Sequence, residues 1–136
     1  MSGNTTLNGV QIKAIAGGAI SNKRLVQLAA PSGSSLLPVA TAAVADDDVV
    51  VGVMDNANGD AVAGDAVTLI NFGVAEVECT GAFVAGATEV TAGALGVGVP
   101  ATAGGRICGV ALQSQASGTG VIKVLMGLAT VVVPTP

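Results

Sequence analysis

The sequence predicts an all-β protein, either a small β-barrel or a β-sandwich, that contains two related hairpin units. The first supporting observation is the glycine content, 20 in 136 residues. This content suits a fold with many turns, because an interior glycine costs a helix about 1 kcal/mol relative to alanine. The second observation is a strict alternation in which Ala75, Val77 and Cys79 would face one side of a sheet. Glu76 and Glu78, which lie between them, would face the other side.

The third observation is a pattern that occurs twice. An apolar strand, a loop of small residues and an alternating strand occupy residues 49–79, and a shorter version occupies residues 106–127. Gly52-Val53 corresponds to Gly109-Val110, Ala63-Gly64-Asp65 to Ser117-Gly118-Thr119, and Val67-Thr68-Leu69 to Ile122-Lys123-Val124. Two copies are too few for a solenoid, which needs at least three stacked repeats. We therefore expect two related hairpins within one barrel or sandwich.

The chain divides into three parts when it is taken in order. Residues 1–8 are polar and without periodicity, so we expect a flexible N-terminal arm. Residues 9–127 are expected to form a single β-domain, and residues 128–136 a short C-terminal tail. Extended or strand-like segments are expected at 10–15, 24–28, 36–44, 49–54, 67–70, 74–79, 89–91, 96–99, in both halves of 106–127, and at 130–133. Turn formers separate them, and Asn58-Gly59 is typical of a hairpin turn with positive φ.

The composition predicts a core that is thin or is completed by another subunit. Hydrophobic residues make up 51% of the chain, yet aromatic residues make up only 1%, namely Phe72 and Phe83. Aromatic rings normally supply much of the buried area of a core. Charged residues are only 10%, against roughly 25% in ordinary soluble domains. Because so few charges cannot cover a monomer's surface, we expect a homo-oligomer.

No catalytic residue, cofactor site or metal site is predicted. The chain has no histidine, the commonest general base and metal ligand. Asp46-Asp47-Asp48 could bind Ca²⁺, but such a run is more often a solvated turn. The segment 55–60 has the wrong ligand order for a calcium loop, because Ala57 and Gly59 stand where ligands belong.

Three further candidates are better explained structurally. Gly93, Gly96 and Gly98 precede no helix, so they do not predict a phosphate loop. Glu76 and Glu78 share a strand face, as a carboxylate pair would, but we expect them to be the solvent side of a strand. Cys79 and Cys108 lie in strand-like runs and are expected to be reduced core thiols rather than a disulfide.

The charge pattern argues against nucleic acid and membrane partners. The net charge is −4, and the basic residues are scattered: Lys13, Lys23, Arg24, Arg106 and Lys123. A nucleic-acid site would need a basic stripe or stacking aromatics. The longest uncharged stretch, residues 25–45, is interrupted by Pro, Gly and Ser, so no membrane span is expected. No secretory signal is expected, since no basic residue precedes Lys13 and no apolar core follows it.

The order of these features from about residue 19 to residue 127 resembles the phage capsid decoration, or cement, proteins. The segments that carry the resemblance are 24–28, 51–53, 63–69, 72–74, 100–104, 109–112 and 124–125. The resemblance implies a β-domain, commonly a trimer, on the outside of the virion head. There it would clamp neighbouring major capsid proteins after synthesis in the host cytoplasm. It implies no catalytic residue.

Two rival functions remain open. The first is a phage head-fibre or surface adhesin domain that binds host glycan, although the absence of Trp and Tyr weakens it, since sugar rings usually stack on aromatic faces. The second is a small enzyme that uses only carboxylates.

Overall fold

The computed structural model describes residues 10–29, 37–45, 48–102 and 105–132, and only the backbone for 128–132. The described residues form strands and one short 3₁₀ helix, so the predicted all-β class is confirmed. The elements are β1 (Val10–Ala16), β2 (Leu25–Ala29), β3 (Val39–Ala42), β4 (Gly52–Met54), β5 (Ala66–Thr80), β6 (Glu89–Ala92), η2 (Ala94–Gly96), β7 (Gly98–Pro100), β8 (Arg106–Ala111) and β9 (Thr119–Val132).

The first five strands close into a barrel. Hydrogen bonding runs in the order β1, β3, β2, β4, β5 and returns from β5 to β1. β1 and β3 are parallel, and the other neighbours are antiparallel. We call this set the first ring. Its interior is filled by aliphatic and small side chains, and its buried residues are Ala14, Ala16, Ile20, Val26, Ala40, Met54, Ala61, Val67 and Leu69.

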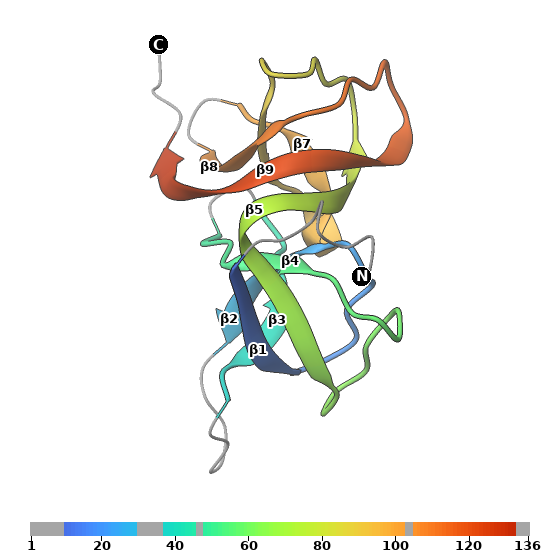
Figure 1. Cartoon of the computed structure of the whole chain (residues 1–136), viewed down its shortest axis with the longest axis vertical. Coiled ribbons are helices and arrows are strands. Elements are labelled where there is room, and N and C mark those ends of the chain that lie inside the picture. The colour runs from blue at the N-terminus through green and yellow to red at the C-terminus, as the bar shows by residue number, and fades with distance from the viewer. Residues whose placement is uncertain (1–9, 30–36, 46–47, 103–104, 133–136) are drawn as a thin grey trace, which may run out of the picture.

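β5 is shared between this barrel and the remaining strands. Its first half pairs with β1 and β4, and its second half pairs with β9 and β7. The order β5, β7, β6, β8, β9 returns to β5 and forms a second closed set, which we call the second ring. In Figure 1, β5 runs from the lower ring into the upper one. It crosses between the rings at Gly73, where φ is 105°.

The register of the two rings is the same, which confirms and extends the repeat seen in the sequence. Val53 is paired with Ile70 in the first ring, and Val110 with Leu125 in the second. Each strand–loop–strand unit also has a glycine with positive φ in its loop. The remaining strands correspond too, because β1 is parallel to β3 as β5 is parallel to β7. The two hairpins therefore lie in separate rings that share β5.

Glycine is required at the matching position of each repeat. A Cβ at Gly52 would lie 2.9 Å from the carbonyl oxygen of Ile70. A Cβ at Gly109 would lie 2.5 Å from the carbonyl oxygen of Leu125. Because backbone atoms cannot move away as a flexible side chain can, both positions need the bare backbone that glycine provides.

Each ring also contains a large side chain from the loop that follows its first strand, β1 or β5. Ile20 forms an isolated bridge with Ala61, and Phe83 forms one with Gln115. Ile20 is 1% exposed and Phe83 2%. The side chains of Ile20 and Phe83 therefore supply core volume that the small strand residues do not.

The two rings pack directly against each other. Leu25, Val53 and Ile70 belong to strands of the first ring, yet they join the hydrophobic cluster of the second ring. This cluster also holds Phe83 and both cysteines. Residues of the first ring are thus covered within the chain by the second ring. Completion of the core by another subunit stays a prediction.

The structure differs from the predicted elements at β5 and at the C-terminal end. The runs 67–70 and 74–79 were expected as separate strands, but they form one strand that continues through Asn71, Phe72 and Gly73. The tail segment is also partly structured, because Val131 and Val132 pair with Ile107 and Arg106 of the same chain. The N-terminal arm lies outside the described residues.

Candidate attachment surface

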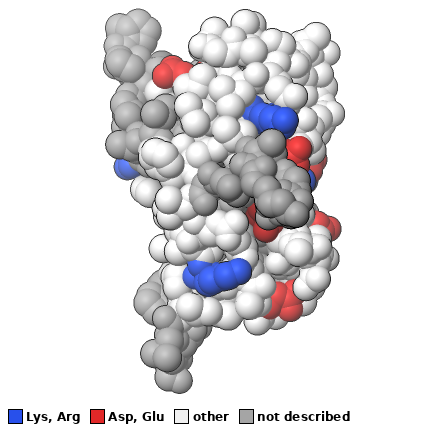
Figure 2. All heavy atoms as spheres, in the orientation of Figure 1, with Lys and Arg blue, Asp and Glu red and all other residues white. Residues whose placement is uncertain are grey.

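Large apolar side chains are exposed over much of the described surface. Figure 2 shows one face on which uncharged residues dominate and charged side chains are few. The exposed residues range from 39% to 65% accessible. They are Val10, Leu28, Leu37, Val44, Val49, Val62, Phe72, Val84, Leu95, Leu112, Val121 and Leu125. Single exposed apolar side chains are normal, so the candidates for protein contact are those that lie together, such as the paired residues Val10 and Phe72.

The two phenylalanines have opposite environments. Phe83 is buried in the second ring, whereas Phe72 is 57% exposed. Phe72 is paired with Val10, which is 61% exposed. The ring of Phe72 lies over Gly127, where a Cβ would be only 2.5 Å from Cδ2. Exposed aromatic residues of this kind often anchor protein interfaces.

The charged residues between the two rings are mostly paired with each other. We call Lys23, Arg24, Asp55, Glu76 and Glu78 the ionic junction. Lys23 Nζ lies 3.3 Å from Asp55 Oδ1 and 3.2 Å from Glu76 Oε1. Arg24 Nε lies 3.3 Å from Glu78 Oε1. The predicted wet face of β5 is confirmed only in part, since the side chains of Glu76 and Glu78 are about one third exposed (35% and 31%) and ion-paired.

The backbone of the turn at residue 23 supports this junction. Lys23 has φ 63°, and its carbonyl oxygen accepts a hydrogen bond from the N–H of Glu78 at 2.9 Å. Partial burial lowers the pKa of Lys23, but Glu76 and Asp55 more than offset this, so its pKa lies above the usual value. The ammonium is therefore held charged where the two rings meet.

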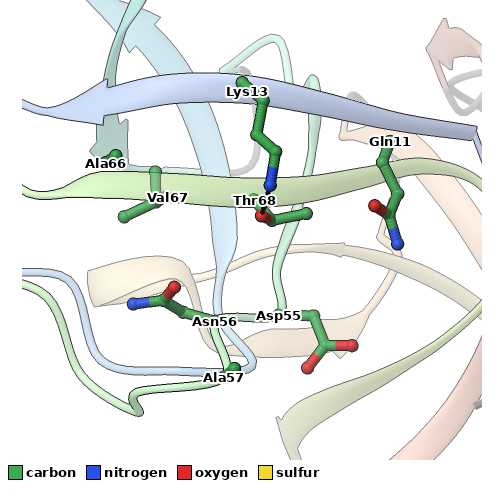
Figure 3. A pocket seen from close by; sticks show the side chains of 8 residues that line it. All are labelled: Gln11, Lys13, Asp55, Asn56, Ala57, Ala66, Val67 and Thr68. Atoms are coloured by element: carbon green, nitrogen blue, oxygen red, sulfur yellow. Dashed lines mark hydrogen bonds between the residues drawn. The ribbon is translucent and has the colours of Figure 1, made fainter.

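A polar depression lies over the outer side of β5 (Figure 3). Its volume is about 400 Å³, and it is lined by residues of β1, β5 and the segment after β4. Lys13 Nζ donates a hydrogen bond to Thr68 Oγ1 at 2.6 Å. In Figure 3 the side chains of Gln11 and Lys13 extend from β1 toward the depression, with Asp55 and Asn56 on the opposite side. The lining residues include no aromatic ring.

A second groove, which we call the Leu95 groove, lies where η2 meets the first ring. Its volume is about 340 Å³. Its walls are mainly apolar and small, and the lining residues are Ala19, Ile20, Ser21, Arg24, Ala42, Asp60, Ala61, Val62 and Leu95. Val62 and Leu95 are 62% and 65% exposed. Leu95 has φ 57° and ψ 25°, the left-handed conformation.

The acidic segments singled out in the sequence have structural roles in the described residues. Asp48 Oδ2 accepts hydrogen bonds from the N–H groups of Val44 and Ala45, whereas Asp46 and Asp47 lie outside the described residues. Asp55 pairs with Lys23, and Gly59 has φ 87°, as expected for a turn. Across the part of the chain that the structure describes, no group of three or more His, Cys, Asp or Glu residues could hold a metal ion.

The glycines at 93, 96 and 98 are placed for packing. A Cβ at Gly96 would approach the carbonyl oxygen of Leu25 within 2.3 Å. A Cβ at Gly98 would approach Cys79 Sγ within 2.7 Å. These contacts explain the glycine spacing without a phosphate.

Both cysteines are free and buried in the second ring. Burial raises the pKa of each thiol to about 12. Cys108 Sγ donates to the carbonyl oxygen of Val90 at 3.3 Å. They therefore behave as core residues. No helix among the described residues is long and apolar enough to span a membrane.

Comparison with known proteins gives a match in fold. No family model matches the sequence, and no curated protein matches it. The structure is similar to the crystal structure of the N base of head fibre gp8.5 in bacteriophage phi29, with a TM-score of 0.63. The similarity covers 90% of this chain and 97% of that chain, at 18% sequence identity. The chain has the fold of a phage head-fibre base.

Sequence reasoning missed the two features that most distinguish this surface. The ionic junction joins residues such as Arg24 and Glu78, which are 54 positions apart, so no local pattern indicates it. Leu95 combines a left-handed backbone with an exposed side chain. The only local signal is that Leu95 lies between Gly93 and Gly96 in a segment without alternation.

Proposed function

We propose that the protein is a structural component of a phage virion, attached to the outer surface of the capsid as the base of a head fibre. Its partner is then the major capsid protein, and its role is non-enzymatic. The observation that carries this proposal is the shared fold with the phi29 head-fibre base, which extends over nearly the whole of both chains. The fold alone does not fix a function, so the surface must support it independently.

The described surface supports attachment through apolar contacts. Twelve large hydrophobic residues are exposed, whereas Lys23, Arg24, Glu76 and Glu78 are engaged with one another or with Asp55. Attachment that depends on apolar area should persist at high salt, because screening weakens charge pairs and leaves apolar burial intact.

A second candidate is a cement protein that decorates the capsid and clamps neighbouring major capsid proteins. The same apolar surface favours it, and so does the low charge content of 10%. In either role we propose a homotrimer on the outer capsid surface, made in the host cytoplasm, without nucleic acid or membrane partners.

Glycan binding has less support. The depression in Figure 3 carries amide, hydroxyl and charged groups that could bind sugar hydroxyls, but no aromatic face lines it. A glycan array probed with the purified protein would test this function directly.

Virion composition tests the main proposal. Purified virions are analysed by quantitative mass spectrometry, and their density is imaged by electron cryomicroscopy. A head-fibre base is expected at fewer copies than the major capsid protein, with density at the outer surface continuing into a fibre. A cement protein is expected at hundreds of copies without a fibre. Absence of the protein from virions would refute both.

A further inference from the structure

Leu95 has an unusual backbone conformation for a leucine, and its apolar side chain is exposed to solvent. Its backbone adopts φ 57° and ψ 25°, a region that glycine or asparagine enters more easily than leucine. Its side chain is 65% exposed and belongs to neither hydrophobic cluster. Residues held in rare conformations are concentrated at binding sites. An apolar side chain that is mostly exposed and lies outside both clusters is therefore available for a contact with another molecule.

Hydrogen bonding and packing hold the backbone at Leu95. Arg24 Nη1 donates a hydrogen bond to the carbonyl oxygen of Leu95 at 3.0 Å, and Arg24 is itself paired with Glu78. The next residue, Gly96, is packed so closely on Leu25 that no Cβ fits. A backbone fixed in this way presents the Leu95 side chain at one place, so only the side-chain rotamer remains to be ordered when a partner binds.

The opposite side of the Leu95 groove adds apolar area and one negative charge. Val62 is 62% exposed, and Ile20 and Ala61 are buried beneath it. Asp60 accepts a hydrogen bond from the N–H of Asn22 through Oδ1 at 2.8 Å. Within the described ranges Asp60 makes no ion pair. Arg24 also lines the groove, but its guanidinium is already engaged with Glu78 and with the carbonyl oxygen of Leu95. The carboxylate of Asp60 is therefore the charge that a ligand can pair with, and the groove is complementary to an aliphatic side chain that is accompanied by a cation.

We propose that the Leu95 groove binds a segment of the major capsid protein in which an aliphatic side chain lies beside a lysine or arginine. The aliphatic side chain enters between Leu95 and Val62, and the cation lies against Asp60. The volume of about 340 Å³ is near the lower limit for small-molecule sites, which suits one or two side chains. This inference rests on the proposed attachment to the capsid.

The first test compares variants for binding to purified capsids that lack this protein, by co-sedimentation. Leu95→Gly removes the side chain and suits the left-handed backbone, so Tm should be unchanged or higher. Its affinity for capsids should fall about tenfold or more, as for a residue at the centre of an interface. Val62→Ala should weaken binding as well. The matched comparison is Val84→Ala, since Val84 is exposed to a similar extent at 60% but lies outside the groove, and it should weaken binding less than Val62→Ala does.

Asp60→Asn tests the charge. It should weaken binding several-fold at low salt, and the difference from the wild type should shrink as salt is added, because a charge pair is screened. If the wild type binds capsids and both Leu95→Gly and Asp60→Asn bind equally well, the inference about the Leu95 groove is wrong. The proposed function is unaffected by that result. A wild-type protein that does not bind capsids at all would overturn the proposed function and the inference with it.

A photo-reactive amino acid in place of Val62 identifies the occupant. Irradiation of decorated capsids should give a crosslink to the major capsid protein, and peptide mapping should place it beside a lysine or arginine. A crosslink to a second copy of this chain, to another virion protein, or to no protein would overturn the inference.

Discussion

Single residues decide how closely the strands can approach each other. Gly52 and Gly109 occupy the same position in the two repeats, and each faces a carbonyl oxygen of the neighbouring strand. Glycine is therefore selected at these positions for space, since neither has a positive φ. Gly18 provides a contrast, because a Cβ there would meet no atom within 4 Å.

We expect Gly109→Ala to destabilise the protein by about 1–3 kcal/mol, the usual cost of overpacking. The reason is that the new Cβ would lie 2.5 Å from the carbonyl oxygen of Leu125 and 2.7 Å from Val124 Cγ1. Gly18→Ala is the matched control and should be neutral or slightly stabilising. Chemical denaturation followed by circular dichroism measures both, and equal midpoints for the two variants would contradict the packing argument.

We expect Cys79 and Cys108 to resist alkylation in the native protein at pH 8 and to react fully after denaturation. Burial raises both pKa values to about 12, so the reactive thiolate is almost absent. The raised pKa also makes stability fall as the pH rises from 9 toward 12, because only the unfolded chain releases these protons there. Electrophoretic mobility of virion protein should be the same with and without reductant. Rapid native alkylation, or a mobility shift, would contradict the prediction.

At the scale of elements, β5 determines the architecture. It contributes one half to each ring, and Ile70 of the first half is buried with the second cluster. Neither ring can lose β5 without opening the other, so the rings should unfold together.

We therefore expect a core change in one ring to lower the stability of both. Val26→Ala removes two buried methyl groups from the first ring, where Val26 is fully buried, at a cost of about 2 kcal/mol. Hydrogen exchange across a denaturant series should show the amides of β8 and β9 losing protection at the same lowered midpoint as those of β2 and β3. Loss of protection confined to the first ring would show that the rings are independent units.

The elements also show what the sequence could and could not predict. The alternation around Glu76 and the repeat beginning at Gly52 and Gly109 predicted strands and hairpins correctly, because both depend on neighbours in the chain. The continuity of β5 through Phe72 was missed, since Asn71 and Gly73 on either side are residues that commonly bound strands. The parallel pairing of β1 with β3 and the contact of Arg24 with Glu78 depend on tertiary packing. Local pattern carries no information about either.

At the scale of the whole molecule, the exposed apolar area should be covered in the assembly. We expect the isolated protein to sediment as a homotrimer at micromolar concentration, because 51% hydrophobic residues with only 10% charged residues leave too little polar surface for a monomer. Phe72→Ala, which removes the largest exposed side chain, should weaken this association. A stable monomer in analytical ultracentrifugation would contradict the expectation.

The chain ends should contribute to attachment more than to folding. Deletion of residues 1–8 or of residues 133–136 leaves all nine strands intact, so circular dichroism and Tm should change little. Retention on capsids should weaken for at least one deletion, since a segment that becomes ordered on docking must gain a partner surface to offset about 1–2 kcal/mol of backbone entropy per residue. If both truncated proteins remain on capsids as firmly as the full chain, attachment depends on the β-domain alone.

The closure of both rings has a consequence for solubility. Among the described residues, each of the nine strands has a hydrogen-bonded neighbour on both sides for at least part of its length, so no strand is a free edge from end to end. Open edges allow copies to join strand to strand and aggregate, and closed sheets remove this route. A chain this rich in valine and alanine therefore has less unpaired backbone through which its copies could join, and contact between copies falls mainly to side chains.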